Sequence, residues 1–359
     1  MKKMLGVSLL LSAGLLLGAC GNSEAAKNDT TESGSTAKGK QEMIVSTFGL
    51  SEDIVKKDVI VPFEKENDAN VTLEVGNSSD RFTKLKNNPK ANIDVIELSQ
   101  NHSVEGNSEE MFLKVTEKEV PNIAQLTDGA KEVFAAGAGV PFTINSIGII
   151  YNEKETGKEI KDWSDLWDKD LKGKISIPDI TATGGPLFMY VASEYKNQNI
   201  AADDGKKAFE AMEELKPNVV KTYSKSSDLA NMFQSGEISV AVVPDFAVDV
   251  IQSANESVEY LVPESGTYAN FNTINIPKNT KNKELAYDYI NYRISAEAQK
   301  RKALSLNEGP INETVELSDE EAENKTYGDI EKRSQPVDFK FINKNMTSWI
   351  DQWNKLMNQ

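Results

Sequence analysis

Short apolar runs alternate with amphipathic stretches in the first third of the chain. Residues 43–47, 70–75 and 93–98 are rich in β-branched and other apolar side chains, which is typical of strands. Between them, residues 52–67 and 82–88 carry apolar side chains at the spacing of a helix that buries one side. The order strand, helix, strand, helix, strand predicts a parallel sheet covered by helices.

The helix predicted over residues 52–67 contains a proline near its middle. Pro62 has no amide hydrogen to donate, so we expect it to kink or split this helix. Ser51 directly precedes the helix and is a residue type suited to capping its first turn.

The same alternation continues to the end of the chain. Further strands are expected at residues 140–151, 174–178, 219–223, 239–243, 259–262 and 271–276. Further helices are expected at residues 163–167, 187–196, 206–215, 228–233, 246–254, 284–301 and 346–357. The extended run 140–151 is too long for one ordinary strand of a small sheet.

The first residues have the pattern of a bacterial targeting segment. Lys2 and Lys3 precede an apolar run over 4–17, which is too short for a comfortable membrane span but has the length of a secretory core. The run ends in Leu-Gly-Ala before Cys20, which resembles the lipobox of bacterial lipoproteins. This resemblance implies a signal peptide over 1–19, cleavage before Cys20 and a lipid on that residue. The alternative is an ordinary signal peptide with an incidental cysteine.

Cys20 is the only cysteine of the chain, so an exported protein would have no internal disulfide. The segment 20–41 continues from it with small and polar residues and no apolar side chain larger than Ala after position 20. Such a segment cannot bury enough surface to offset the entropy of ordering, and it is expected to be a flexible tether. The folded part then runs from residue 42 to 359, a length that usually divides into two domains.

The chain as a whole is acidic. The chain has 40 basic and 56 acidic side chains and a formal net charge of −16, and cleavage of the signal peptide would remove two lysines more. This balance argues against nucleic acid as a partner and disfavours adhesion to anionic lipid. It is compatible with a cationic ligand, although acidic surface is more often simply solvated.

Four segments together resemble the bacterial extracellular solute-binding proteins of ABC importers, near the spermidine/putrescine, iron(III) and thiamine group. They are 163–179, with Trp-Ser-Asp-Leu-Trp and Leu-Lys-Gly-Lys-Ile; 235–245, Ser-Gly-Glu-Ile-Ser-Val-Ala-Val-Val-Pro-Asp; 262–282; and 286–299. The resemblance implies an α/β fold of the periplasmic-binding-protein type (type II), with two lobes, a ligand cleft and a hinge of two crossing strands. Lobe 1 would hold residues 42–143 and 272–359, and lobe 2 residues 144–271.

The resemblance also implies the partners and the location. A small-molecule ligand would be captured by lobe closure and passed to the permease and ATPase of the importer. The protein would be a monomer, held by its lipid at the extracytoplasmic face of the cell membrane. A polyamine or similar organic cation is the favoured ligand, and iron(III), thiamine-type and anionic organic ligands are alternatives. A non-transport surface lipoprotein or an enzyme is the competing class.

Ligands of open α/β sheets bind beyond the carboxyl ends of the strands, and this rule nominates the site. The nominated residues are Thr47, Phe48, Glu97, Leu98, Ser99, Gln100, Thr143, Asn145, Thr181, Thr183, Gly184, Gly185, Asp245, Phe246, Tyr268, Asn270 and Asn272.

Several nominated residues have competing interpretations. The resemblance implies that Asp245 pairs with a ligand ammonium, but Asp245 could instead cap the helix over 246–254. Glu97, a second acid at a strand end, could equally form a salt bridge at the surface or between the lobes. Phe48, Phe246 and Tyr268 could form a cation–π wall or simply pack in the core.

The Thr183-Gly184-Gly185 turn opens a helix whose free amides could hold an anion, or it is a loop hinge without a ligand role. Ser226 and Ser227 precede another helix and could simply cap it.

No residue is nominated as catalytic, as a metal ligand or as a binder of a cofactor. His102 is the only histidine and is expected in a surface loop, so a catalytic triad or a His-rich zinc site has only one imidazole to draw on. The chain contains no Tyr-Tyr pair of the kind that iron(III) binders in this family often use, and no P-loop. The sequence therefore predicts a binding protein rather than an enzyme.

Overall fold

The computed structural model describes residues 39–357. The predicted signal peptide 1–19, Cys20 and nearly all of the predicted tether lie outside the described residues. Within the described part of the chain, no helix is long and apolar enough to cross a membrane.

The strands pair in the spatial order β2-β1-β3-β9-β4-β7-β5-β6, with β10 beside β9 and β8 beside β4. They are β1 Gln41–Thr47, β2 Ala69–Val75, β3 Val95–Ser99, β4 Val140–Tyr151, β5 Ile175–Pro178, β6 Val219–Tyr223, β7 Val240–Pro244, β8 Glu259–Leu261, β9 Thr267–Asn275 and β10 Ser334–Pro336. Pairing is parallel in β2-β1-β3 and in β7-β5-β6, and antiparallel where β9 and β4 join these two groups. We call the part built on β1, β2 and β3 lobe 1, and the part built on β5, β6 and β7 lobe 2.

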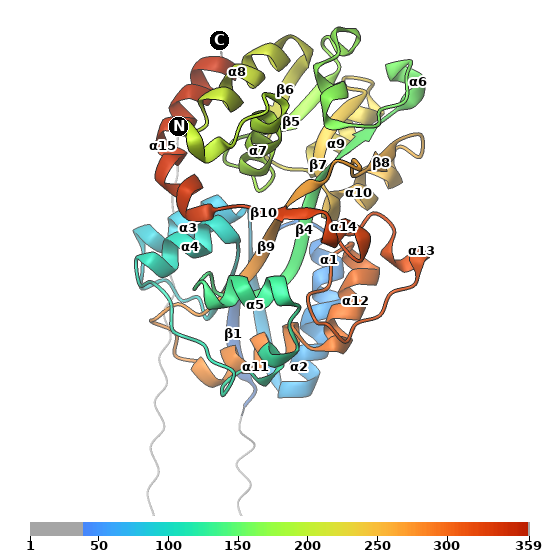
Figure 1. Cartoon of the computed structure of the whole chain (residues 1–359). Helices are drawn as coiled ribbons and strands as arrows, with labels where there is room; N and C mark the ends of the chain where they lie inside the picture. Colours follow the sequence, from blue (N-terminus) through green and yellow to red (C-terminus); the bar gives the residue numbers. More distant parts are fainter. Residues whose placement is uncertain (1–38, 358–359) are drawn as a thin grey trace, which may run out of the picture. The chain divides into compact units, whose positions relative to one another are not determined.

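Two long strands connect the lobes. β4 pairs with β9 through residues 140–146 and with β7 and β8 through residues 147–151, so one strand serves both groups. Figure 1 shows β4 and β9 running side by side between the lower and the upper part of the fold. The twelve-residue length of β4 is the length predicted from the sequence, whereas the lobe boundaries at 143/144 and 271/272 stay a prediction.

Helices cover the strands and the chain ends in a long helix. They are α1 Glu52–Val55, α2 Val61–Asn67, α3 Ser78–Asn87, α4 Gln100–Ser108, α5 Asp128–Ala135, α6 Glu153–Thr156, α7 Gly185–Tyr195, α8 Lys206–Leu215, α9 Ser227–Gln234, α10 Val248–Ala254, α11 Lys283–Arg293, α12 Ala296–Leu306, α13 Asp319–Ala322, α14 Asp329–Lys332 and α15 Phe339–Met357. Short 3₁₀ turns at Pro121–Gln125, Trp163–Trp167, Lys169–Leu171, Ile200–Ala202, Lys216–Asn218 and Asp245–Ala247 join them.

Pro62 splits the first predicted helix, as expected. A π-helical segment, Lys56–Ile60, separates α1 from α2. Pro62 cannot donate to the carbonyl of Asp58 four residues earlier, and that carbonyl instead accepts a hydrogen bond from Arg301 Nε at 2.9 Å. Ser51 precedes α1, but its side chain does not cap the helix.

The single helix predicted over 284–301 is wrong, because the structure has two helices there. α11 ends at Arg293, and the Ser295 side chain caps α12 by accepting a hydrogen bond from the amide of Ala298. A serine at this position offers the backbone an alternative to a continuous helix. The break allows α11 and α12 to present different side chains to the interior.

Each lobe has its own apolar core. The lobe 1 core includes Met43, Phe63 and Ile274, and the main lobe 2 core includes Ile177 and Phe188, all nearly inaccessible to solvent. Strands and helices both contribute to these cores, because each element turns its apolar side chains toward the interior of its lobe.

The C-terminal helix packs against both lobes. Trp349 and Trp353 of α15 are buried in the main core of lobe 2, next to α8, although the sequence assigned residues 272–359 to lobe 1. Trp349 Nε1 donates to the carbonyl of Asp204 at 2.9 Å. Nearer its start, α15 also touches lobe 1, where Asn343 Nδ2 donates to the carbonyl of Asn101 at 2.8 Å.

Candidate functional site

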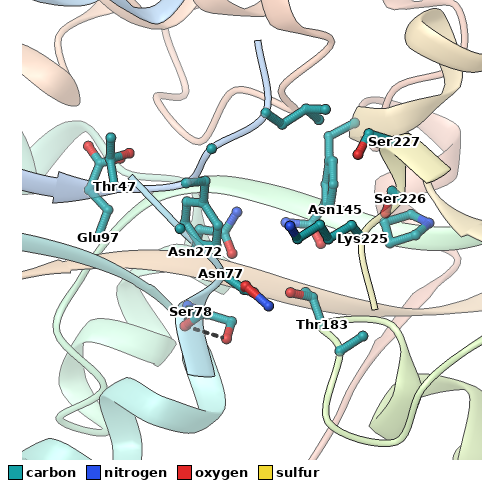
Figure 2. Close-up of a pocket in the computed structure, with 18 of the residues that line it drawn as sticks. Thr47, Asn77, Ser78, Glu97, Asn145, Thr183, Lys225, Ser226, Ser227 and Asn272 are labelled. Carbon is teal, nitrogen blue, oxygen red and sulfur yellow. Dashed lines mark hydrogen bonds between the residues drawn. The ribbon is translucent and has the colours of Figure 1, made fainter. Parts of the chain in front are cut away.

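A cavity of about 820 Å³ lies between the two lobes, and both lobes line it. Figure 2 shows it with side chains from both lobes pointing inward. From lobe 1 and the segments packed on it come Thr47, Phe48, Gly49, Leu50, Ser51, Val55, Val75, Gly76, Asn77, Ser78, Ser79, Asp80, Glu97, Ser99, His102, Thr143, Asn272, Arg293, Leu306 and Glu308, and from β4 and lobe 2 come Asn145, Pro178, Thr181, Ala182, Thr183, Gly184, Tyr223, Ser224, Lys225, Ser226, Ser227, Pro244, Phe246 and Val250.

The position of the cavity follows from the direction of the strands. The lining begins at the carboxyl ends of β1, β2 and β3 in lobe 1 and of β5, β6 and β7 in lobe 2. Because parallel neighbours end at the same edge of a sheet, the loops that follow them are brought together. This is the location that the sequence predicted for the ligand site.

Four helices of eight or more residues begin at the cavity. The residue before the first turn is Asn77 for α3, Ser99 for α4, Gly184 for α7 and Ser226 for α9, and all four line the cavity. None of these residues caps its helix through a side chain. The first amides of each helix therefore add a partial positive charge on the cavity side.

Hydroxyl groups and one lysine add further donors on the lobe 2 side. The hydroxyls of Thr183, Ser224 and Ser227 make no side-chain hydrogen bond within the described residues. Lys225 forms no ion pair within residues 39–357, and Figure 2 shows its side chain extending into the cavity. Each of these groups can donate to a bound molecule.

Two buried side chains also present donors that lack a partner within the described residues. Asn145 is 2% exposed and its Nδ2 has no hydrogen-bond acceptor, while Arg293 is 2% exposed and its Nη1 has none. Both residues line the cavity. A buried donor without a partner costs free energy, so an acceptor supplied by a ligand would stabilise the structure at both positions.

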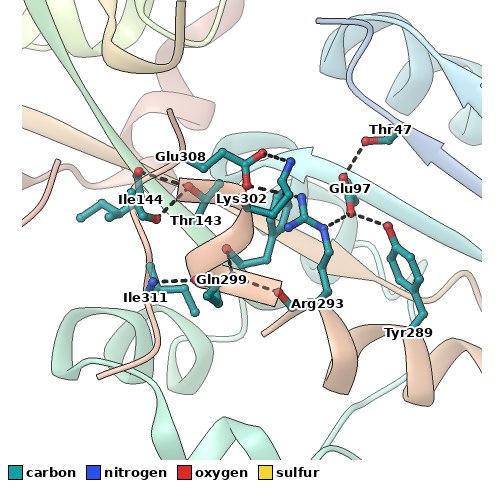
Figure 3. Close-up of polar contacts among 12 residues, drawn as sticks. Thr47, Glu97, Thr143, Ile144, Tyr289, Arg293, Gln299, Lys302, Glu308 and Ile311 are labelled. Atoms are coloured by element: carbon teal, nitrogen blue, oxygen red, sulfur yellow. Dashed lines mark hydrogen bonds and ion pairs between the residues drawn. The ribbon is translucent and has the colours of Figure 1, made fainter. Parts of the chain in front are cut away.

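The carboxylate of Glu97 is already engaged by protein groups (Figure 3). It accepts hydrogen bonds from Thr47 Oγ1 at 2.6 Å and Tyr289 Oη at 3.0 Å. Arg293 Nε donates to it at 3.2 Å. Burial works to raise the pKa of Glu97, but the charge of Arg293 and these hydrogen bonds hold it below its ordinary value. Glu97 therefore forms a salt bridge, but the pair is buried within lobe 1 and lies neither at the surface nor between the lobes as the sequence suggested.

Glu308 is engaged in the same buried cluster. Its carboxylate lies 3.5 Å from Arg293 Nη2 and 3.0 Å from Lys302 Nζ. Burial lowers the pKa of Lys302 to about 8, against the opposing charge of Glu308. We call Glu97, Arg293, Lys302 and Glu308 the ion cluster. Its two positive and two negative charges offset each other, and it leaves little net charge to face a ligand.

His102 is not in a surface loop, and that prediction was wrong. It lies in α4 and lines the cavity, with Nδ1 at 2.9 Å from Ser78 Oγ and 3.1 Å from Ser99 Oγ. Burial, with a smaller contribution from the charge of Arg81, lowers the pKa of His102 to about 4. The imidazole is neutral at physiological pH and orients the two serine hydroxyls.

The structure brings most of the nominated residues together at the cavity. Those that line it are Thr47, Phe48, Glu97, Ser99, Thr143, Asn145, Thr181, Thr183, Gly184, Phe246 and Asn272. Those that do not are Leu98, Gln100, Gly185, Asp245, Tyr268 and Asn270. The members of the second group belong to the same loops and strands, but their side chains, except for Gly185, which has none, are buried or bonded to other protein groups.

Asp245, the most specific candidate for a ligand contact, faces the protein. It is 1% exposed, and its carboxylate accepts hydrogen bonds from the amide and hydroxyl of Thr326 and from the amide of Phe246. Its carbonyl accepts another from Asn307. Asp245 therefore fastens the segment after α12 to lobe 2, and the cavity wall beside it is formed by Phe246.

Tyr268 and Asn270 are held by protein partners as well. The Tyr268 hydroxyl donates to Glu194 and its ring lies 5.0 Å from that of Tyr190, measured between centroids. Asn270 donates to Asn272 at 3.0 Å and accepts from the amide of Gln100. Core packing, one of the two interpretations of Tyr268 from the sequence, describes its position.

Replacing Asp245 with asparagine should change the pH dependence of stability while leaving ligand affinity almost unaltered. Burial raises the pKa of Asp245 to about 7 from an ordinary value of 3.8. Because the folded-state pKa is raised, the stability that protonated Asp245 contributes is present below about pH 4 and is lost as pH rises through 7. Asparagine cannot titrate, so the stability of the wild type relative to the variant should fall across this interval.

Thermal melts of both proteins between pH 4 and 8 measure this difference. A difference that does not vary with pH would mean that Asp245 stays ionised in the folded protein. A large loss of ligand affinity would return Asp245 to the binding site.

Sequence reasoning missed two cavity loops and part of the ion cluster. The loops 76–80 and 223–227 follow β2 and β6, which had both been predicted as strands. Applying the rule of carboxyl ends to these two strands would have found them. Arg293 and Glu308 come from α11 and the segment after α12, and no local pattern connects them with Glu97.

The comparisons with known proteins point to one family. A profile described as "Bacterial extracellular solute-binding protein" matches residues 58–328. The Spermidine/putrescine-binding periplasmic protein 1 of Haemophilus influenzae is 24% identical over 313 residues, which cover 85% of this chain and 84% of that protein.

Two solved structures share the fold. A crystal structure of an ABC transporter from Clostridium perfringens ATCC 13124 is 48% identical, with a TM-score of 0.76, and the match covers 88% of this chain and 100% of that chain. The binding protein AgtB from A. tumefaciens R10, in complex with agropinic acid, is 19% identical with a TM-score of 0.74, covering 89% and 99% of the two chains. At that identity, the second match shows the fold alone.

Proposed function

The chain belongs to the bacterial extracellular solute-binding proteins, and from this premise we propose that its cavity captures a small organic anion. It is the substrate-binding protein of an ABC importer. Membership confirms the family resemblance seen in the sequence, the α/β periplasmic-binding-protein fold class and the expectation that the chain is not an enzyme. The chemical identity of the ligand is the subject of the proposal.

The observation that carries the proposal is the excess of free donors over free acceptors in the cavity. Asn145 Nδ2, Arg293 Nη1 and Lys225 Nζ face it without a partner in residues 39–357, together with four uncapped helix starts. The buried lining carboxylates, Glu97 and Glu308, are paired within the ion cluster. A ligand rich in acceptors fits this surface, because each free donor then gains a partner.

A polyamine is the second candidate, and the names of the relatives favour it. The Haemophilus influenzae relative and the Escherichia coli spermidine/putrescine-binding periplasmic protein are 24% and 23% identical to this chain. A polyamine would need unpaired carboxylates in the cavity. Asp80 is the lining acid that lies outside the ion cluster, and it is exposed in the first turn of α3.

A thermal-shift screen of the purified protein separates the two candidates. Organic phosphates, phosphonates and carboxylates should raise the melting temperature by mass action, and spermidine and putrescine should not. Thiamine compounds and iron(III), which the sequence left open, belong in the same screen. Stabilisation by polyamines alone would refute the proposal and support the second candidate.

Both lobes contribute donors, and this arrangement supports a mechanism by lobe closure. The starts of α3 and α4 belong to lobe 1, and those of α7 and α9 belong to lobe 2. A ligand that accepts hydrogen bonds from both sides binds the closed state better than the open one, and so shifts the population toward it. The permease and its ATPase would receive the closed form, with the protein acting as a monomer.

The proposal includes a lipid anchor on Cys20, with signal peptide cleavage before it, at the extracytoplasmic face of the membrane. Replacing Cys20 with alanine should release the protein from the membrane fraction, because the only thiol that could carry the lipid is lost. Fractionation of cells that express each form, followed by immunodetection, measures this. A variant that stays in the membrane fraction would contradict the anchor.

A further inference from the structure

We propose that the anionic end of the ligand is a phosphoryl or phosphonyl dianion, held in lobe 2 where α7 and α9 begin. This inference rests on the proposed function, because it names the chemical class of the organic anion and the part of the cavity that binds it. We call the loops 181–184 and 224–227, with Asn145, the lobe 2 subsite.

The two loops are neighbours because their strands are neighbours. β5 and β6 pair in parallel, with Pro178 opposite Tyr223 at their carboxyl ends. The loop after β5 leads to Gly184 and α7, and the loop after β6 leads to Ser226 and α9. Two helices of 11 and 8 residues therefore begin side by side at the cavity.

Asn145 supplies an independent sign of a missing ligand. A Cβ placed on Gly184 would lie 3.3 Å from Ile147 Cγ2, so the start of α7 touches the face of β4 that carries Ile147. Asn145 lies two residues earlier on the same strand and shares that face. Its Nδ2 is buried without an acceptor in the described residues, and Figure 2 shows the side chain at the cavity with Lys225.

The charge of the subsite matches a dianion. Each helix start contributes roughly half a positive charge and Lys225 a full one, which gives about two positive charges in all. None of the lobe 2 residues that line the cavity is Asp or Glu. Asp179, which precedes the first loop, accepts hydrogen bonds from the amide and hydroxyl of Thr181, and Asp228 is exposed in the first turn of α9 outside the lining.

The number of donors favours three acceptor oxygens over two. The hydroxyls of Thr183, Ser224 and Ser227, the Lys225 ammonium and the Asn145 amide are available. The helix starts add their partial charge more than free amides, because the amide of Gly185 donates to the carbonyl of Ala182 and Pro186 has no amide hydrogen. A phosphoryl group has three terminal oxygens that accept hydrogen bonds, and a carboxylate has two. A tetrahedral dianion therefore satisfies more of these groups than a carboxylate can.

The remainder of the cavity requires an organic body on the ligand. Its volume of about 820 Å³ greatly exceeds the needs of an inorganic ion. Phe48 and Val55 of lobe 1 and Phe246 and Val250 of lobe 2 give it apolar walls. A phosphate ester or phosphonate with a compact apolar body fits both regions.

Calorimetric titration with matched probes tests the class of anion. Phenyl phosphate, phenyl sulfate and benzoate share one ring and differ in the anionic group, and inorganic phosphate tests the subsite without a body. At pH 8 phenyl phosphate should bind at least tenfold more tightly than phenyl sulfate or benzoate, because it alone among the aromatic probes is a dianion. Its affinity should fall as pH drops below about 6, where the phosphate takes up its second proton.

Variants test the location. Lys225→Met and Ser227→Ala should each weaken phenyl phosphate binding, Lys225→Met by about 10- to 100-fold, since a hydrogen bond to a charged group is lost. Lys172→Met is the matched control, because Lys172 is exposed in the turn before β5 and outside the cavity lining. The control should bind like the wild type, and all three should keep the wild-type melting temperature in the absence of ligand.

The outcomes separate this inference from the proposed function. Benzoate or phenyl sulfate binding as tightly as phenyl phosphate, or more tightly, would refute the dianion. So would the absence of binding by both phosphate and phenyl phosphate. In either case the proposed function would still hold if a carboxylate bound. Wild-type affinity in Lys225→Met would overturn the location. Binding of spermidine alone would overturn both the inference and the proposed function.

Discussion

Replacing Arg293 with methionine is expected to lower the free energy of unfolding by about 3–5 kcal/mol, because it removes one partner of a buried ion pair. The side chains of Arg293 and Glu97 are each 3% exposed and lie 3.2 Å apart. Without the guanidinium, Glu97 keeps its hydroxyl partners Thr47 and Tyr289, and Glu308 keeps Lys302, among the described residues. Methionine retains much of the apolar volume against Phe142, so the loss reports mainly the charge.

Urea denaturation at pH 7 measures this loss. Adding Glu97→Gln to Arg293→Met should recover part of the stability, because it removes one of the carboxylates left without its cation. Lys207→Met, which breaks an exposed pair with Glu210, is the control and should denature close to the wild type. A loss below about 1 kcal/mol in Arg293→Met would mean that the ion cluster contributes little to stability.

The ion cluster also explains why the polyamine prediction has little support from the geometry. In the sequence, Glu97 is an acid at the end of a predicted strand, which is a reasonable candidate for pairing with a cationic ligand. Its partners Tyr289 and Arg293 lie almost 200 positions later, and nothing local indicates them. Asp245 is a similar case, because Thr326 closes over it from 81 positions away. Charge is visible in a sequence, but the partners of a charged side chain that lie far along the chain are not.

The parts of the site that the sequence did predict are those that follow from strand direction. Thr47 and Ser99 end β1 and β3, and Thr183 and Gly184 lie in the loop that follows β5. The rule of carboxyl ends then places them at one edge without knowledge of the tertiary contacts. Phe246 was placed at the cavity by the same rule, although the adjacent Asp245 turned away from it.

The fold was predictable to a similar extent. Apolar periodicity identified β4 and most covering helices, because each depends on local spacing. It located the apolar side of α15 through Trp349 and Trp353, but it could not say which lobe receives that side. The surface against which an amphipathic helix packs is decided by the tertiary structure and not by its own sequence. In this chain α15 returns to lobe 2 after the segment that carries β10.

Replacing Trp349 with alanine should therefore destabilise lobe 2, with a loss of about 3–5 kcal/mol in the free energy of unfolding. Trp349 is fully buried, and its Nε1 donates to the carbonyl of Asp204, which would be left without this donor. The packing of Gly205 against the indole would be lost as well. The two are so close that a Cβ built on Gly205 would lie 2.9 Å from a ring carbon of Trp349. The cavity left by an indole cannot close without moving α8 or α15.

Amide hydrogen exchange shows which lobe loses stability in this variant. In Trp349→Ala, amides of α7 and α8 should exchange faster, while those of β1 and β3 should change much less, because lobe 1 has a separate core. Lys355→Ala, on the exposed side of the same helix, is the control and should leave exchange and melting unchanged. Faster exchange confined to lobe 1 would contradict the placement of α15, since the aromatic side chains would then be stabilising the other lobe.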